Sequence, residues 1–532
     1  MSITLGIDLG TTNTCVAVHR QKRSPNGELF FSTEVLTDFM TGQKLIPSMV
    51  ALDKGQELVG VQAKEGRKKN ATNTIFEAKR FIGRRYSDPI VQAATESTRY
   101  PFKITKDGVF SNNVAFEVTH QNQKIKLRPE EVAAKVLSYV RDYASHALGV
   151  PSITKAVITV PAYFEDSQRQ ATMAAARAAG FQEVRLLNEA TSAALALKEE
   201  DPTTIGKRVL VFDFGGGTFD VSIVKIEREH VTVLGTHGAT DLGGGDIDYK
   251  IMEHCIKNFA VDSSTNKQPT EKKKEMLRVE VQRAKESLMG RDEVEIEVDC
   301  YADGQDLEIV FTRDQLNSLC QTLYSRCISI VDELLVNTKL QPKDIDIVQL
   351  VGGSSRLTKI QELLNSKFKG KVRQTMNPDE AVAVGSAVCH KHILFDVNPH
   401  SLGIKVVSSS ATTEENTMSI LIPRNSKIPC KFEDVYMTAF DYQTSITVDV
   451  YQGEASIISL NSFLDTFIIR NLPPLPKGEA MIRITMIIDS DGILHVTAKD
   501  SRDRSNSASI KIGKVRDQYI IREQRREPVH QR

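Results

Sequence analysis

GIDLGTTNTCVAV at residues 6–18 and VFDFGGGTFDVSIV at residues 211–224 share one pattern. In each, an apolar run ends in an aspartate, small glycine and threonine residues follow, and a second apolar run comes next. Short apolar runs separated by glycine-rich residues are typical of β-strands joined by tight turns. The sequence therefore predicts two similar β-hairpins, far apart along the chain, with Asp8 and Asp213 at equivalent places.

The turn of each hairpin has the chemistry of an anion-binding loop. The small residues of the two turns are Gly10, Thr11, Thr12, Gly215, Gly216, Gly217 and Thr218. Successive backbone N–H groups in such a turn form a concave surface for an anion, and glycine lets a phosphate approach the backbone. A carboxylate beside the turn requires a cation between it and the phosphate, and Mg²⁺ commonly bridges the two. A single hairpin of this kind is ordinarily a plain turn, but two matched copies predict a clamp for a polyphosphate.

Two further glycine motifs are VGGSSR at 351–356 and DLGGGD at 241–246. The first follows an apolar strand and precedes a helical stretch, and such a junction can seat a nucleoside against the backbone. The planar guanidinium of Arg356 could stack over a base. A plain strand-to-helix turn explains either motif equally well when it is considered alone.

The pattern of apolar and polar residues changes near residue 396. Before it, strand-type apolar runs alternate with helical stretches, which predicts an α/β architecture. Helices are predicted over 130–147, 167–179, 189–199, 271–289, 314–337, 358–368 and 379–391. From Asp396 to Ile512, period-two alternation between turn signals predicts an antiparallel β-sandwich. The expected organisation is a first domain over 1–390, a linker over 391–397, a β-domain over 398–512 and a basic, disordered tail over 513–532.

Composition excludes several classes of protein. Lys+Arg and Asp+Glu both number 68 in 532 residues. This balance argues against binding to nucleic acid or to an anionic membrane through the net charge of the molecule. No apolar run approaches the roughly 18 residues of a membrane helix, and no secretory signal is visible. The seven cysteines form no CxxC motif, so free thiols are expected, with Cys320 and Cys327 on one buried helix face. We expect a cytoplasmic protein, with the nucleus as the alternative, and no nucleic-acid or membrane partner.

Several strings resemble the 70-kDa heat-shock protein chaperone family, within the actin and sugar-kinase superfamily. They include GIDLGTTNTCVAV (6–18), FEAKRFIGRRY (76–86), VITVPAYFEDSQRQAT (157–172), VFDFGGGTFDVSIV (211–224), LVGGSSR (350–356), NPDEAVAVGSAV (377–388) and DSDGILHVTAKD (489–500). The resemblance covers about residues 3 to 512. It implies a two-lobed, actin-like α/β ATPase domain followed by an antiparallel β-sandwich domain that binds extended apolar peptides.

The resemblance also implies roles for individual residues. Lys79 matches a lysine that orients the attacking water, and Asp8 and Asp213 match carboxylates that hold hydrated Mg²⁺. The other matched catalytic positions are Glu189, Thr218 and Asp220. The matched positions for ATP or ADP are Gly10, Thr11, Thr12, Asn13, Gly215, Gly216, Gly217, Gln282, Lys285, Glu286, Met289, Gly352, Gly353, Ser354, Arg356 and Asp379. K⁺ is a further expected ion.

Other matched residues concern the β-domain. Val407 and Ala439 match residues that arch over the peptide, and Ile446 matches its central pocket. Pro161 and Arg169 match a relay between the domains. Ordinary packing in a sandwich core explains the three β-domain residues equally well, and Lys79 considered alone would be a solvated lysine.

The chain departs from the family pattern on the base side of the site. The family presents Glu, Lys, Arg and Ser where this chain has Gln282, Lys285, Glu286 and Met289. Glu286 replaces an arginine whose cation–π contact with adenine is worth about 0.5–2 kcal/mol. We therefore expect weaker or altered base recognition, with Glu286 paired to Arg356.

Three other departures concern contacts between parts of the chain. Gly245 stands where the family has Glu, which predicts a looser contact across the cleft. His390, Lys391 and His392 replace part of an acidic-leucine linker pattern, so the strength of interdomain coupling is open. The family's helical lid would need roughly 100 further residues, so we expect a lidless chain that releases peptide quickly.

Two functional hypotheses follow. The first is an ATP-dependent chaperone for unfolded or nascent polypeptides, with slow ATP hydrolysis and with a J-domain co-chaperone and a nucleotide exchange factor as partners. The second is a nucleotide-binding co-chaperone or ribosome-associated regulator with little or no turnover. A sugar kinase is disfavoured because it would not explain the β-domain.

Overall fold

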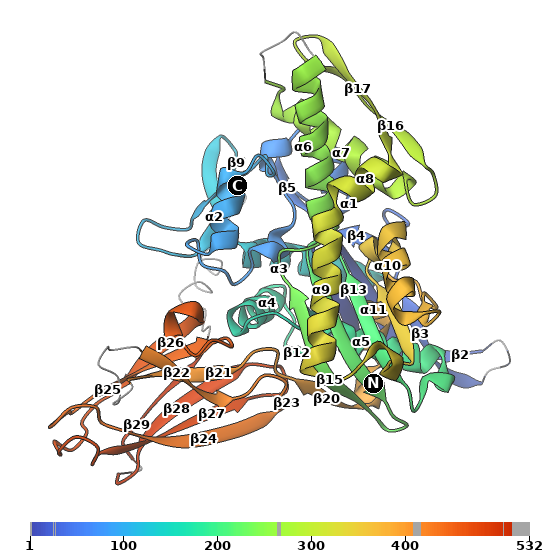
Figure 1. The fold of residues 1–532 in the computed structure, drawn as a ribbon. Helices are drawn as coiled ribbons and strands as arrows, with labels where there is room; N and C mark the ends of the chain where they lie inside the picture. The colour runs from blue at the N-terminus through green and yellow to red at the C-terminus, as the bar shows by residue number, and fades with distance from the viewer. Residues whose placement is uncertain are drawn as a thin grey trace, which may run out of the picture. The chain divides into compact units, whose positions relative to one another are not determined.

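The computed structural model describes residues 3–512 except Pro25, Gly27, 263–267, 408–415 and Arg504. The chain divides into two compact units, and each is described by itself. The first unit comprises Met1–Phe164 and Ala179–Phe395, and the second comprises Glu165–Ala178 and Asp396–Arg532. Figure 1 labels their helices and strands.

The first predicted hairpin lies in the first of two large sheets of the first unit. Its strands are β1 (Thr4–Leu9), β2 (Asn13–Arg23), β3 (Leu29–Val35), β4 (Leu45–Pro47), β11 (Lys155–Val160) and β12 (Glu183–Asn188). The order is β12-β11-β1-β2-β3, with β4 also paired to β2. Strand β1 is antiparallel to β2 and parallel to β11, so the turn between β1 and β2 lies at one end of the sheet.

The second predicted hairpin repeats this arrangement in the other large sheet. Its strands are β13 (Arg208–Phe214), β14 (Phe219–Ile226), β15 (His230–Ala239), β18 (Ile347–Val351), β19 (Val372–Arg373) and β20 (Ile393–Val397). The order is β19-β18-β13-β14-β15-β20. Strand β13 is antiparallel to β14 and parallel to β18, and Asp213 lies opposite Asp220 in the ladder. Both hairpins are therefore confirmed, each with a parallel neighbour.

Smaller sheets and helices complete the first unit. The further strands are β5 (Val50–Asp53), β6 (Gln56–Val59), β7 (Thr74–Ile75), β8 (Lys103–Lys106), β9 (Val114–His120), β10 (Gln123–Leu127), β16 (Glu293–Ala302) and β17 (Gln305–Thr312). The α-helices are α1 (Val61–Gly66), α2 (Pro89–Glu96), α3 (Pro129–Ala147), α5 (Glu189–Glu200), α6 (Gly244–Asp262), α7 (Glu271–Ser287), α8 (Arg313–Leu319), α9 (Gln321–Asn337), α10 (Thr358–Phe368) and α11 (Ala381–Val388). The predicted helix over 314–337 is two helices that meet at Cys320, and α6 was not predicted.

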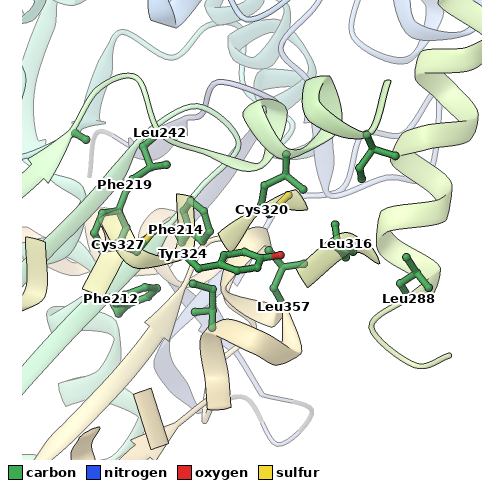
Figure 2. Packing of buried hydrophobic residues seen from close by; sticks show 14 of the residues in the cluster. Phe212, Phe214, Phe219, Leu242, Leu288, Leu316, Cys320, Tyr324, Cys327 and Leu357 are labelled. Atoms are coloured by element: carbon green, nitrogen blue, oxygen red, sulfur yellow. The ribbon is translucent and has the colours of Figure 1, made fainter. Parts of the chain in front are cut away.

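The second hairpin is held by a large hydrophobic core. Phe212, Phe214 and Phe219 are fully buried in it, together with Cys320 and Cys327 (Figure 2). Both cysteines are buried in this core as predicted, but they do not share a helix face, because Cys320 lies at the break between α8 and α9 whereas Cys327 lies within α9. All seven cysteines are free thiols. Burying one phenylalanine contributes about 1.5–3 kcal/mol, so the core holds the strands that lead into the turn.

The second unit consists of α4 (Asp166–Ala178) and antiparallel strands. These are β21 (Leu402–Val407), β22 (Asn416–Ile422), β23 (Lys427–Ile428), β24 (Cys430–Met437), β25 (Ile446–Gln452), β26 (Ser462–Ile469), β27 (Met481–Ile488), β28 (Leu494–Asp500) and β29 (Ser507–Lys511). Two four-stranded sheets, β22-β21-β25-β26 and β24-β27-β28-β29, contribute to one hydrophobic core that includes Ile404, Val450 and Val496. The predicted tail over 513–532 lies outside the described residues. None of the helices in the described ranges combines the length and apolarity needed to cross a membrane.

Candidate functional site

A cleft of about 500 Å³ in the first unit brings the predicted site residues together. Its lining includes Asp8, Gly10, Thr11, Thr12, Asn13, Lys79, Glu189, Asp213, Gly215, Gly216, Thr218, Gln282, Lys285, Glu286, Met289, Gly352, Gly353, Ser354, Arg356 and Asp379. Gly217 and Asp220 are not among the lining residues. The residues come from both hairpins, from the short 3₁₀ helix Ala78–Arg80, from α5, from α7 and the residues just after it, and from the loops that follow β18 and β19.

The two glycine turns pack directly against each other. A Cβ atom on Gly216 would lie 2.0 Å from Thr12 Oγ1, and one on Gly217 would lie 2.5 Å from Thr11 Cγ2. Side chains cannot approach this closely, so the contact requires glycine at both places. Gly216 and Gly217 therefore join the two turns.

The DLGGGD motif supports the second turn from behind. Gly244 N–H donates to Gly215 O at 2.9 Å, and Gly245 N–H donates to Gly216 O at 2.8 Å. The VGGSSR motif does the same from another side, because Ser354 Oγ donates to Gly215 O at 2.9 Å. The backbone carbonyls of Gly215 and Gly216 therefore accept hydrogen bonds from residues outside the turn.

Lys79 and Glu189 form a buried ion pair at the phosphate side of the cleft. The Lys79 Nζ–Glu189 Oε1 distance is 2.6 Å, and each side chain is 8% exposed. Lys79 lies in a short 3₁₀ helix, Ala78–Arg80, and Glu189 is the first residue of α5. Burial alone would lower the pKa of Lys79, but the Glu189 and Asp8 carboxylates raise it above its usual value. The ammonium group is therefore a permanent positive charge.

Carboxylates outnumber lysines at this end of the cleft. Burial, and then the charge of Glu189, raise the pKa of both Asp8 and Asp213. Asp220 is 1% exposed, and its Oδ1 accepts from Tyr163 N–H at 3.2 Å. Buried carboxylates with a single lysine leave a surplus of negative charge that a cation would neutralise.

The donor set suits a hydrated ion. Within the described ranges, no three side chains of His, Cys, Asp or Glu are placed to enclose a metal unaided. Mg²⁺ usually keeps several waters and takes one or two carboxylates together with phosphate oxygens. Asp8 and Asp213 on opposite hairpins therefore fit Mg²⁺ held through water.

The base side of the cleft differs from the expectation. Glu286 accepts from Gln282 Nε2 at 3.1 Å, and it does not pair with Arg356. The Arg356 guanidinium instead lies 2.5 Å from Asp379 Oδ2 and donates to Asn377 Oδ1 at 3.2 Å. The predicted Glu286–Arg356 pair is wrong, because Gln282 on the same helix donates to Glu286, and Asp379 and Asn377, in the segment after β19, take the guanidinium of Arg356.

Lys285, also on α7, is fixed by two contacts. Lys285 Nζ lies 2.8 Å from Asp248 Oδ1 and donates to Gly244 O at 3.3 Å. Glu286 is exposed, whereas Gln282 and Met289 are half-buried. The side chains that line the base side of the cleft are therefore partly open to water.

An ionic cluster that sequence reasoning missed joins the two halves of the first unit. Asp246 Oδ1 and Oδ2 lie 2.6 Å from Arg99 Nη1 and Arg80 Nη2, respectively. A Cβ atom on Gly245 would lie 2.4 Å from Glu77 Oε1. The missing side chain of Gly245 makes room for this cluster, and a looser contact than with the family's Glu stays a prediction. No local motif marks Arg99.

The two predicted relay residues, Pro161 and Arg169, are both buried. Pro161 is buried, and its carbonyl accepts from Phe164 N–H at 3.1 Å, in a turn next to the Tyr163–Asp220 bond. Arg169 is buried in α4, within the second unit.

The predicted peptide residues lie in the β-strands and loops of the second unit. Ala439 is half-buried and donates its N–H to Gln443 Oε1 at 3.0 Å. Ile446 begins β25 and packs on the core, and Val407 ends β21 with its side chain outside the described part. Phe440 and Tyr442, in the same loop as Ala439, are 68% and 69% exposed and were not predicted.

Comparisons with known proteins agree with this geometry. The Hsp70 protein family matches residues 4–525. Heat shock cognate 70 kDa protein 3 of Dictyostelium discoideum is 36% identical over 511 residues, which cover 93% of this chain and 78% of that protein. A heat shock 70 kDa protein of Neurospora crassa is 37% identical over 516 residues, which cover 94% of this chain and 76% of that protein. The chain therefore belongs to the Hsp70 family.

Proposed function

We propose that the chain is an ATP-dependent molecular chaperone that couples slow ATP hydrolysis to the binding of extended apolar segments of unfolded or nascent polypeptides. The observation that carries this proposal is the contact between the two glycine turns beside the Lys79–Glu189 pair. Family membership supports the same conclusion, since relatives of this chain are named heat shock proteins.

The nucleotide would lie along the cleft. The turns at Gly10 to Asn13 and at Gly215 to Thr218 would bind the phosphates through backbone N–H and hydroxyl groups. Asp8 and Asp213 would hold Mg²⁺ through water, with K⁺ as a further ion, and bound Mg²⁺ would neutralise phosphate charge. Ribose and base of ATP or ADP would lie between α7 and the segment Gly352 to Arg356.

Lys79 would act on the reacting phosphate. Its buried ammonium provides a positive charge where phosphoryl oxygens gain negative charge in the transition state. Glu189 holds that ammonium in place at 2.6 Å. Thr218 contributes a hydroxyl at the second turn, and Asp220 anchors the nearby backbone through Tyr163.

Hydrolysis is tested by single turnover of ATP with the purified chain. We expect slow hydrolysis that Lys79→Ala reduces strongly, whereas Lys207→Ala, which changes an exposed lysine, leaves the rate unchanged. Equal rates for the wild type and Lys79→Ala, with ATP still bound, would contradict the ATPase.

Peptide binding would use the second unit. Ile446 would form a pocket for one apolar side chain, with Val407 and Ala439 over the peptide backbone. The exposed rings of Phe440 and Tyr442 would add contact area. Pro161 and Arg169 would relay the nucleotide state, and a J-domain co-chaperone and a nucleotide exchange factor would be partners.

The peptide site is tested by fluorescence anisotropy with a labelled apolar peptide. We expect Ile446→Asp to abolish binding, while Ile487→Asp, which changes an exposed isoleucine on β27, retains it. Binding that survives Ile446→Asp would place the peptide elsewhere.

A second candidate is a nucleotide-binding co-chaperone or ribosome-associated regulator with little turnover. The exposed Glu286 favours it, because a carboxylate cannot make the cation–π contact with a base that an arginine makes. ATP binding without measurable turnover, and without stimulation by peptide, would identify this function.

A further inference from the structure

Strand β20 joins the sheet of the first unit directly after a group of titratable side chains. Ile393, Leu394 and Phe395 pair in parallel with residues 230–232 of β15, and Figure 1 shows the two strands side by side. The two residues before β20, Lys391 and His392, contact the last turn of α5. The attachment of β20 therefore begins at these contacts.

His392 is held between a cation and an anion of α5. Its Nε2 lies 2.9 Å from Glu199 Oε1, and its Nδ1 lies 3.3 Å from Lys198 Nζ. A lysine ammonium can only donate, so Nδ1 must accept and the ring proton must lie on Nε2, where it donates to Glu199. These two partners together require a neutral imidazole.

Protonation of His392 would place an N–H group against the Lys198 ammonium. The His392 side chain is only 9% exposed, so water does little to relieve this repulsion. Burial and the charge of Lys198 lower the pKa of His392, although Glu199 opposes them and Lys391 adds to them. Lys391 Nζ lies 2.6 Å from Glu199 Oε2, so it competes for the same carboxylate.

We propose that His392 is a pH-sensitive latch that holds β20 on β15 while the imidazole is neutral and releases it on protonation. A group whose pKa is depressed in the attached state stabilises that state above its ordinary pKa and loses this effect as pH falls. Attachment should therefore be complete above about pH 7 and weaken below the ordinary histidine value of 6.5.

The latch lies at the opposite end of α5 from the cleft. Helix α5 carries Glu189, the partner of Lys79, at its first residue and Lys198 and Glu199 in its last turn. Ten helical residues span about 15 Å, so one rigid element contacts both the cleft and the entry to β20. The latch itself does not depend on ATP hydrolysis.

Hydrogen exchange of the amides of residues 393–395 in the full chain tests the latch, between about pH 5 and pH 8. After correction for the intrinsic rate, we expect wild-type protection to be lost as the pH falls through about 6.5. His392→Gln should keep its protection at low pH, because the amide donates to Glu199, accepts from Lys198 and does not titrate. The control variant His390→Gln should retain the wild-type profile. His230 is not a suitable control, because it pairs with Ile393 and its ring packs on Phe395.

Lys198→Met provides a second variant. Without the ammonium, protonated His392 no longer faces a cation at Nδ1. Burial still disfavours the charged ring, so the loss of protection should move to lower pH than in the wild type. A wild-type profile that is flat, or a His392→Gln or Lys198→Met profile that falls like the wild type, would overturn the latch.

Discussion

The two ends of the cleft are built in different ways. At the phosphate end, glycine turns pack so closely that a Cβ atom on Gly216 would meet Thr12 Oγ1 at 2.0 Å, and the side chains of Lys79, Glu189 and Asp213 are buried. At the base end, Glu286 is exposed and Gln282 is half-buried on α7, and Met289, just after this helix, is half-buried. Side chains on one helix can change without moving the backbone, whereas the glycine turns cannot. We therefore expect the affinity for nucleotide to come mainly from the phosphates and the metal.

The largest difference between the ends should appear in turnover. Lys79→Ala is expected to lower single-turnover hydrolysis about 10²- to 10³-fold, because it removes a buried positive charge from the reacting phosphate. Glu286→Ala should leave that rate within a few-fold of the wild type. A comparable loss in both variants, measured at saturating ATP, would show that the two ends contribute alike.

The next effect concerns packing of the turns. Gly216→Ala places a methyl group against Thr12, and overpacking of this kind costs about 1–3 kcal/mol, or about 5- to 150-fold in ATP affinity. Gly66→Ala is the matched control, since a Cβ atom there meets nothing within 4 Å. Calorimetry that gives the same affinity for Gly216→Ala and the wild type would show that the turns do not hold the phosphates.

A third effect comes from the charge at Asp8. Its pKa is raised by burial, so the carboxyl stabilises the nucleotide-free chain at acidic pH, and this contribution is lost as pH rises above the ordinary carboxyl range. Asp8→Asn should therefore raise the melting temperature of the nucleotide-free chain at about pH 8, by roughly 2–4 °C per kcal/mol recovered. The same variant should lose the additional stabilisation by Mg²⁺ with ATP. A nucleotide-free chain that melts lower after this substitution would contradict the assignment.

The smallest effect should come from the base end. Glu286→Arg restores a cation that can stack on a base, and a gain of about 0.5–2 kcal/mol corresponds to about 2- to 30-fold tighter ATP binding. Glu308→Arg makes the same charge change at an exposed site on β17 and should leave affinity unchanged. If Glu286→Arg weakened binding, the base would not lie beside α7.

Local patterns in the sequence predicted most of the helices and strands. Both hairpins, the helices now observed as α3 and α5, and the antiparallel strands of the second unit were predicted, because apolar periodicity and glycine spacing are local signals. Helix α6 was missed because its first residues, Gly244 to Asp246, form part of a glycine-rich motif that indicates a loop. The helix predicted over 314–337 is interrupted at Cys320, where α8 ends and no local signal marks the break.

Contacts between distant segments could not be predicted. The ion pairs of Asp246 with Arg80 and Arg99 join residues far apart in the chain, and neither arginine has a spacing that reveals its partner. The pairing of Glu286 with Arg356 failed for a related reason, since the nearer Asp379 takes the guanidinium. The cleft could be predicted from its glycines, but the ion pairs of Asp246 and of Arg356 around it could not.

The most direct test is a calorimetric titration of the purified chain with ATP, with Mg²⁺ at saturation and with Mg²⁺ removed by a chelator. Two glycine turns that hold a metal-bound triphosphate predict a clear binding heat with Mg²⁺, a much weaker one without it, and a similar dependence for ADP. An absence of binding heat for either nucleotide at saturating Mg²⁺ would contradict the account of the cleft.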